Sequence, residues 1–290
     1  MLALHLISWG EMTLRNGQQA FEFLCKRFGQ IIGGAGFGVF NGFCDAGVQR
    51  KIPVRVLGRS ATGAGQVTGS FFNFGSFDRQ GRALNLGQIA VLPEEVNPLI
   101  KILQSKGVLI ASINDSFLST TPTMLDVGVV QIENPLIFAR HIADAFQTLS
   151  IETIPITQKK SALCDRYANL IGATSFGIIN GFCVAGRFRN IPVEILGRSA
   201  NGGNEVTSSF FDAGPIDNQG RSLNIGQIAV LPQEVDPFIQ ILKSVNIPVS
   251  TVDTPFIFAK PLIRLVRVEA VENPLVFARK IGIAFKRLLG

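Results

Sequence analysis

The sequence predicts an α+β fold that arose by tandem duplication, and two observations support this prediction. Residues 21–151 align with residues 160–290 at a constant offset of 139, without a gap and with about half of the positions identical. Within each copy, helical and strand-like apolar periodicities are mixed. The repeat is far longer than the about 20–50 residues of a solenoid unit and has the length of a domain. We therefore expect two copies of one domain, related by a pseudo-two-fold axis.

The domain boundaries follow from the offset. We expect a first repeat at residues 1–150, with an N-terminal extension at 1–17, and a second at 151–290, with a linker at about 150–159. The N-terminus has no positively charged region and no small-residue cleavage site, so we predict no clear signal peptide.

Each copy is expected to open with a helix, at residues 18–32 and 159–171. In the first copy, four apolar residues recur at helical spacing from Phe21 to Ile31, and Gly33 ends the helix. Four strand-like segments follow. In the first copy they are residues 37–43, 53–57, 67–72 and 84–91.

A proline at the start of the second segment in both copies, Pro53 and Pro192, indicates an edge position or a strand entry, because proline cannot donate to a ladder. A second helix is expected at 93–107, with Pro93 in its first turn and Gly107 at its end. Its counterpart covers 232–245.

Strands at 108–113 and 124–132 are expected next, on either side of a loop through Pro122. The last helix begins at Asn134-Pro135, a cap and first-turn pair. This order predicts a mainly antiparallel sheet with helices on one face.

The composition restricts the function classes. The chain is 47% apolar and only 17% charged, against a typical share of about 25%. We therefore expect a broad apolar face, buried between the two copies or against further copies of the protein. The net charge of +6 is spread along the chain and the chain has one Tyr and one Trp, so we expect no nucleic-acid partner. No apolar stretch reaches the about 18 residues that would predict a transmembrane segment.

The four cysteines repeat with the domain, Cys25 with Cys164 and Cys44 with Cys183, and none forms a C-x-x-C motif. Three alternatives stay open. The thiols are buried small side chains, or they form a bridge from Cys25 to Cys44 and another from Cys164 to Cys183, or all four bind a metal across the pseudo-two-fold axis.

Several polar residues are identical in both copies, and four arginines among them are candidates for ligand binding. Arg59, Arg82, Arg198 and Arg221 could line two equivalent anion sites, because a guanidinium group suits carboxylate or phosphate. The alternative is that these arginines pair with Asp78, Glu95 and their equivalents, to fix loops and the contact between the repeats.

Other motifs give no site. Gly34-x-Gly36-x-Gly38 lies between a helix and a strand, the reverse of the order in a dinucleotide site. His5 and His141 are the only histidines and neither repeats, so a catalytic triad is not expected.

Residues 84–146 resemble a bacterial family of uncharacterised proteins, the LppY/LpqO-like family or domain of unknown function 1259. The matching segments are Leu86-Gly-Gln-Ile-Ala-Val-Leu-Pro-Glu-Glu-Val-Asn-Pro98, Ile110-Ala-Ser112 and Glu133-Asn-Pro-Leu-Ile-Phe-Ala-Arg140, and the second copy matches at 231–237 and 272–279. The resemblance implies a two-copy protein and carries no settled activity.

The resemblance also implies a His-Asn-His triplet and a further histidine in the next strand, and this chain has none of them. The corresponding residues are Asn114, Asp115, Ser116 and Gly128 in the first copy, and Asp253, Thr254, Pro255 and Arg267 in the second. The two copies also differ most in this segment. We therefore expect a scaffold that has been kept while the histidine site was lost.

Our first hypothesis is a non-enzymatic structural protein without a cofactor, which associates with itself as a homo-oligomer or larger assembly. The second is a small-molecule or anion binder that uses a cleft between the repeats. The third is a metal-dependent enzyme that uses Asp115, Asp126 and Asp253. We expect the protein in the bacterial cytoplasm, or in an assembly associated with the cell or the spore.

Overall fold

The computed structural model describes residues 17–150 and 152–289. Most of the predicted N-terminal extension, with His5, lies outside these residues. The first repeat contains α1 (Gly17–Ile31), β1 (Ala35–Phe40), β2 (Phe43–Gln49), β3 (Arg55–Val56), β4 (Arg59–Ser60), α2 (Gly65–Thr68), β5 (Gly69–Gly75), β6 (Ala83–Val91), η2 (Pro93–Glu95), α3 (Val96–Ser105), β7 (Leu109–Asp115), β8 (Thr120–Thr121), β9 (Leu125–Glu133) and α4 (Pro135–Phe146).

The second repeat follows the same order, with one added strand at its start. It contains β10 (Gln158–Lys159), α5 (Ala162–Ile171), β11 (Thr174–Ile179), β12 (Phe182–Phe188), β13 (Glu194–Ile195), β14 (Arg198–Ser199), α6 (Asn204–Thr207), β15 (Ser208–Ala213), β16 (Ser222–Val230), η3 (Pro232–Glu234), α7 (Val235–Ser244), β17 (Val249–Asp253), β18 (Ala259–Lys260), β19 (Arg264–Glu272) and α8 (Pro274–Leu289).

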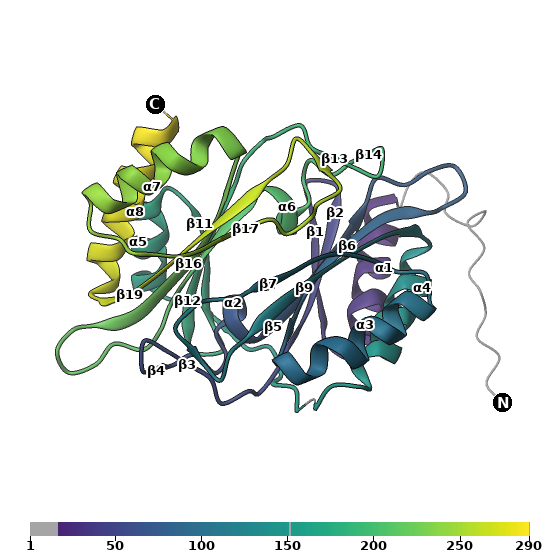
Figure 1. Cartoon of the computed structure of the whole chain (residues 1–290), viewed down its shortest axis with the longest axis horizontal. Helices are drawn as coiled ribbons and strands as arrows, with labels where there is room; N and C mark the ends of the chain where they lie inside the picture. Colours follow the sequence, from purple (N-terminus) through teal and green to yellow (C-terminus); the bar gives the residue numbers. More distant parts are fainter. Residues whose placement is uncertain (1–16, 151, 290) are drawn as a thin grey trace.

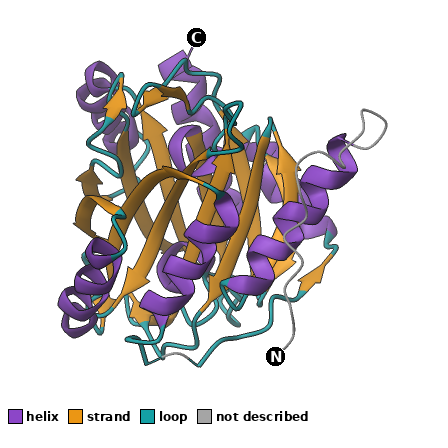
Figure 2. Cartoon of the chain, turned by 90° about the vertical axis from the view of Figure 1, so that its right-hand side faces the viewer, coloured by secondary structure: helices purple, strands orange, loops and turns teal. Residues whose placement is uncertain are grey.

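The two repeats form four layers. Each repeat contributes one large antiparallel sheet, in the order β1-β2-β5-β6-β9-β7 or β10-β11-β12-β15-β16-β19-β17. The two sheets face each other, and the long helices of each repeat cover the outer face of its own sheet (Figure 1). Figure 2 shows the helices of the first repeat lying across their strands. The α+β class, the duplication and the helices on one face of each sheet are therefore confirmed.

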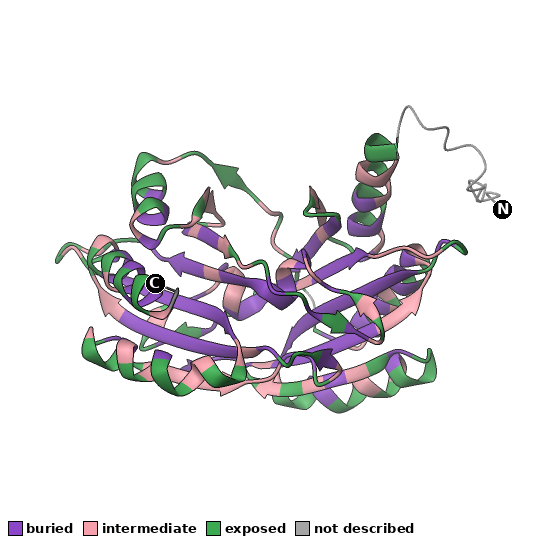
Figure 3. Ribbon diagram, turned by 90° about the horizontal axis from the view of Figure 1, so that it is seen from above, coloured by how far each residue is buried: buried purple, intermediate pink, exposed green. Residues whose placement is uncertain are grey.

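The buried side chains explain the low charge of the sequence. Each repeat has a core between its helices and its sheet. Two further clusters combine residues of both repeats, for example Leu84 and Leu86 with Val193 and Leu265. Every residue of β6 and β16 is buried, because one face of these strands meets helices and the other meets the opposite sheet (Figure 3).

One predicted strand is wrong. Residues 37–43 do not form a continuous strand but contain the turn of a hairpin between β1 and β2. Asn41 and Gly42 have φ angles of 49° and 80°, as a two-residue turn between twisted strands requires, and Asn180 and Gly181 repeat this geometry. The Asn-Gly pair between two apolar segments was the available signal.

Two further strand predictions need correction. At 67–72, the chain first completes the short helix α2 and enters β5 only at Gly69. At 53–57, only Arg55–Val56 is a strand, and it pairs with β4 and β8 in a small separate sheet.

The linker is bound to both repeats. Lys51 N donates to Glu152 O at 2.7 Å, and Ile154 N donates to Gln49 O at 2.8 Å. Its last two residues form β10, which pairs with Ile178 and Ile179 of β11. The described residues of this linker therefore hydrogen-bond to both repeats.

All four cysteines form disulfides within their own repeat. Cys25 on α1 is bonded to Cys44 on β2, and Cys164 on α5 is bonded to Cys183 on β12. Each bridge ties the first helix of a repeat to its sheet. Of the three alternatives, the structure has the second.

Candidate functional site

The contact between the repeats is built from pairs of equivalent interactions. Arg59 Nη2 lies 2.6 Å from Asp217 Oδ2, and Arg198 Nη2 lies 2.7 Å from Asp78 Oδ2. The second pair is the first with the repeats exchanged, because Arg198 is equivalent to Arg59 and Asp78 is equivalent to Asp217 at the offset of 139. This exchange is the signature of a two-fold contact.

The short helices α2 and α6 are capped across the same contact. Asn73 Oδ1 of β5 accepts a hydrogen bond from Glu205 N at 2.7 Å, and Asp212 Oδ2 of β15 accepts one from Gln66 N at 3.2 Å. Each acceptor satisfies an N–H group that a helix leaves unpaired in its first turn. The helical turn in each repeat thus depends on a side chain of the other repeat.

Each hairpin turn also packs on a glycine of the other repeat. A Cβ atom on Gly202 would lie 2.4 Å from Asn41 O, and one on Gly63 would lie 2.9 Å from Asn180 O. Both glycines have positive φ angles, so other residues are disfavoured by the backbone and by the contact.

The four arginines predicted to bind anions are held by two aspartates. Besides their partners across the contact, Arg82 Nε lies 2.8 Å from Asp78 Oδ2 and Arg221 Nε lies 3.5 Å from Asp217 Oδ2. Hydrogen bonds from the Arg221 N–H and the Arg59 side chain lower the pKa of Asp217 to about 2. The structure therefore brings these arginines together in two pairs, Arg59 with Arg221 on Asp217 and Arg82 with Arg198 on Asp78. Of the partners in the alternative interpretation, Asp78 and its equivalent are found, whereas Glu95 pairs with Arg50.

Arg267 lies at the centre of the contact and is fully buried. From β19 it reaches the first repeat, where its Nη2 lies 2.6 Å from Asp126 Oδ2, and its Nη1 lies 2.8 Å from Asp253 Oδ2 on its own sheet. Its Nη1 also donates to the main-chain oxygens of Asp115 and Ser116. The side-chain oxygen of Gln227 accepts from Nε at 3.2 Å and from Nη2 at 3.1 Å. Two carboxylates, two main-chain carbonyls and one amide oxygen thus surround the guanidinium group.

The other positions of the predicted degenerate site gather around Arg267. Asn114 Nδ2 donates to Thr254 O at 3.1 Å. Gly128 faces the second repeat so closely that a Cβ atom would lie 2.4 Å from Pro255 O. The structure therefore brings all eight aligned positions into one region, in which each repeat contacts the other.

Three acidic side chains near this region were missed by the sequence analysis. Burial raises the pKa of Glu205 to about 8, and the pKa values of Asp45 and Asp212 to about 7. Gln88 Nε2 donates to Glu205 at 3.2 Å, and Asn204 and Asn73 donate to Asp45. Each acid lies where the other copy has an uncharged residue. This difference between the copies is the sequence signal that could have identified the three acids.

Asp115, Asp126 and Asp253, the residues of the metal hypothesis, do not converge on a shared free position. Two of the carboxylates bind Arg267, and Asp115 meets it through its main-chain oxygen. Burial raises the pKa of Asp253 to about 6 despite the guanidinium. Among the described residues no group of three or more metal-binding side chains is found.

The glycine motif near the N-terminus serves packing. A Cβ atom on Gly34 would lie 2.0 Å from Gly47 O, and one on Gly36 would lie 2.4 Å from Cys25 O. These glycines let α1 and β2 approach β1. Their role is therefore the close contact of backbones.

The comparisons with known proteins agree with the duplication. Residues 26–148 and residues 168–287 each match the family model described as Domain of Unknown Function (DUF1259). The comparisons with curated proteins and with solved structures gave no match. No described helix combines the length and apolarity needed to cross a membrane. With most of its length matched in two segments, the chain belongs to the DUF1259 family and contains the family domain twice.

Proposed function

We propose that this protein is a non-enzymatic structural component that associates with copies of itself. The observation that carries the proposal is that the polar residues at the centre of the contact bind one another. Arg267, Asp126 and Asp253 join the two sheets in a buried ion-pair network. Groups that are fully committed to a contact between repeats hold the scaffold together and are not available to a substrate.

Exposed apolar side chains support the association. Phe23 on α1 is 60% exposed and Phe40 on β1 is 41% exposed, near the outer edge of the first sheet. Within the described residues no strand pairs with this edge, and Glu22 Oε1 accepts the hydrogen bond of Val39 N at 3.3 Å. In the second repeat, β10 occupies the equivalent edge. An apolar edge strand is a template for pairing with another chain.

The two disulfides support a location for such an assembly. Disulfides persist in oxidising surroundings and are rare in the cytoplasm. Of the locations expected from the sequence, an assembly associated with the cell or the spore fits the bridges best.

The alternative, an anion or small-molecule site in a cleft between the repeats, has less support. Its four arginines are paired with Asp78 and Asp217. Apolar clusters of both repeats also fill the contact. The metal-dependent enzyme has the least support, because Arg267 is already bound to two of its three carboxylates.

Light scattering after size-exclusion chromatography tests the proposal, together with electron microscopy. We expect particles larger than one chain, whose mass rises with protein concentration. The variant Phe40→Lys places a charge on the open edge and should lower the mass. Its matched control, Ile179→Lys, lies at the same place on the edge that β10 covers and should not. A single-chain mass at all concentrations and salt conditions contradicts the proposal.

A further inference from the structure

Three Asn-Gly pairs lie wholly within the described residues, at 41–42, 180–181 and 201–202. In such a pair, the backbone nitrogen of the glycine can attack the side-chain carbonyl carbon of the asparagine, because glycine has no Cβ atom to hinder the approach. The attack requires a side chain that is free to turn and a nitrogen that is free of hydrogen bonds. The fold therefore decides which of the three pairs can react.

At Asn41, neither reacting group is held. The side chain is exposed and forms no hydrogen bond with the described residues. Gly42 N donates to no described group, and a Cβ atom on Gly42 would meet no atom within 4 Å. The tip of this hairpin therefore has both the freedom and the space for the attack.

At Asn180, the equivalent turn holds the side chain. Asn180 Oδ1 accepts hydrogen bonds from Thr157 N at 2.9 Å and from Thr157 Oγ1 at 3.1 Å, and Asn180 Nδ2 is buried. Thr157 directly precedes β10, which covers this edge of the second sheet. Both hydrogen bonds must break before the side-chain carbonyl carbon can turn toward Gly181.

At Asn201, the side chain and the glycine are both restrained. Asn201 Nδ2 donates to Asn190 Oδ1 at 2.8 Å, and Asn201 Oδ1 is buried. Gly202 packs so closely on the first repeat that a Cβ atom would lie 2.4 Å from Asn41 O. The third pair is therefore less free to rearrange than the first.

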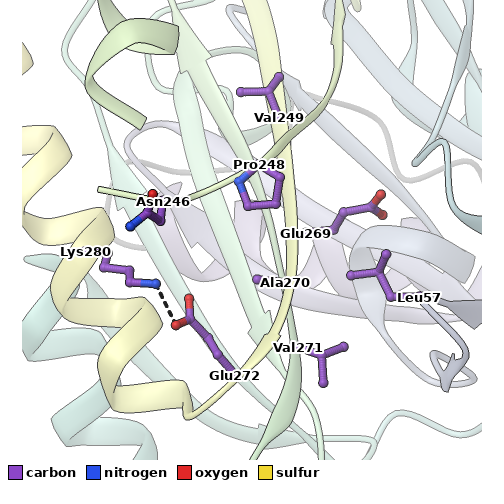
Figure 4. A pocket seen from close by; sticks show the side chains of 9 residues that line it. All are labelled: Leu57, Asn246, Pro248, Val249, Glu269, Ala270, Val271, Glu272 and Lys280. Atoms are coloured by element: carbon purple, nitrogen blue, oxygen red, sulfur yellow. Dashed lines mark hydrogen bonds and ion pairs between the residues drawn. The ribbon is translucent and has the colours of Figure 1, made fainter. Parts of the chain in front are cut away.

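Asn246 has a free side chain but no free nitrogen behind it. Its φ angle of 55° is close to the 49° of Asn41, and its exposed side chain borders a pocket at the edge of the second sheet (Figure 4). The next residue is Ile247, whose nitrogen donates to Leu242 O at 2.9 Å and whose β-branched side chain is buried. Among these four asparagines, only Asn41 combines a free side chain with a free glycine nitrogen.

We propose that Asn41 is a site of spontaneous modification, at which the asparagine becomes aspartate or isoaspartate. Gly42 N attacks Cγ of Asn41, a C–N bond forms, and the side-chain nitrogen leaves as ammonia with the proton of the attacking nitrogen. Water then opens the resulting five-membered imide. Cleavage of the Cγ–N bond gives aspartate, and cleavage of the bond to the main-chain carbonyl carbon gives isoaspartate.

The modification would change the contact between the repeats as well as the turn. Both products carry a negative charge that asparagine lacks, and isoaspartate lengthens the backbone by one methylene group. Because Asn41 O lies against Gly202 of the second repeat, a longer turn no longer fits this contact. The proposal goes beyond self-association and does not depend on it.

Incubation of the folded full chain at mildly alkaline pH, followed by peptide mapping with mass spectrometry, tests the proposal. We expect conversion at Asn41 to be about tenfold faster than at Asn180 and Asn201, which corresponds to a barrier lower by about 1.4 kcal/mol. The rate should rise with pH, because the attacking nitrogen must lose its proton. In urea the three pairs should convert at similar rates, because glycine follows each asparagine. Equal rates in the folded chain, or faster conversion at Asn180 or Asn201, overturn the proposal.

Two variants of Thr157 test the cause of the difference. Thr157→Pro removes both donors to Asn180 Oδ1 and keeps the carbonyl that accepts from Asn180 N. It should raise the rate at Asn180 toward that at Asn41, whereas the matched control Thr157→Ser keeps both donors and should not. An unchanged rate at Asn180 in folded Thr157→Pro overturns the proposed cause. If Thr157→Pro does not fold, the three rates in the parent protein still decide whether Asn41 is the site.

Discussion

The rim and the centre of the contact between the repeats are built differently. At the rim, the ion pairs of Arg59 and Arg198 are mirrored, and these side chains are 33% and 23% exposed. At the centre, Arg267 is fully buried and has no counterpart, because the equivalent residue is Gly128. Mirrored contacts specify how two copies of one domain dock against each other. The centre of the contact is not mirrored, and it contains the charged groups whose removal from water costs the most free energy. The two regions should therefore respond very differently to substitution.

The largest expected effect is at the centre. Arg267→Met removes the guanidinium and leaves the carboxylates of Asp126 and Asp253 buried without a cation. Breaking a buried ion pair from one side costs about 3–5 kcal/mol, and we expect a loss of this size in the free energy of unfolding, measured by urea denaturation. Adding Asp126→Asn and Asp253→Asn should restore most of it. A triple variant as unstable as Arg267→Met alone would show that the charges are not the cause.

The disulfides come next and test whether the two repeats are equally stabilised. Each bridge spans 19 residues, and closing a loop of this length stabilises a fold by about 3 kcal/mol in the chain-entropy model. Cys25→Ala with Cys44→Ala should therefore cost about as much as Cys164→Ala with Cys183→Ala. Thermal unfolding of the two variants measures the difference, and a clearly unequal loss would contradict the equivalence of the bridges.

The acidic residues near the centre should make stability depend on pH. Burial raises the pKa of Glu205 to about 8, while the pKa in the unfolded chain is near its ordinary value of about 4.3. Between these values the folded state holds a proton that the unfolded state has lost, so stability falls as pH rises, by about 1.4 kcal/mol per pH unit for such a group.

Glu205→Gln introduces the residue of the first repeat, Gln66, and tests this pH dependence. Urea denaturation from pH 5 to 8 should show a shallower decline for the variant, because one buried acid that titrates in this range is absent. Asp45 and Asp212, with pKa values of about 7, and Asp253, with a pKa of about 6, still contribute. Parallel profiles of the variant and the parent protein would exclude a contribution from Glu205.

The smallest effects are expected at the rim. Arg59→Ala and Arg198→Ala each remove a partly exposed ion pair, which is worth about 0.2–1 kcal/mol. Since the two pairs share no residue, their losses should add in the double variant. A double loss well above the sum would mean that the mirrored pairs act together.

Much of the fold could be predicted from the sequence, because the residues that start, end and pattern each helix or strand lie within that element. The helix at Pro93, the helix that begins at Asn134-Pro135 and the buried strand at 84–91 each contain their own start, stop or periodicity. The hairpin at Asn41-Gly42 was readable too, and its turn signal was overlooked. The short helix α2 was not, because Asp212 of the other repeat caps it.

The candidate site was predicted in part. The differences between the copies pointed to the region of Asn114 and Arg267, and the structure places these residues on opposite sides of one contact. The ion pairs of Arg267 with Asp126 and Asp253 could not be predicted, because they join residues 141 and 14 positions apart in the chain.

The sequence by itself determined the duplication, the α+β class and the faces that each helix buries, because these depend on identities and periodicities along the chain. Only the tertiary structure decided what the polar residues do. Arg59 and Arg82 form ion pairs with aspartates, and Arg267 lies at the centre of the contact between the repeats. The physical reason is that the role of a charged side chain depends on its partners and on its exposure to solvent. Here several of the partners come from the other copy of the same domain.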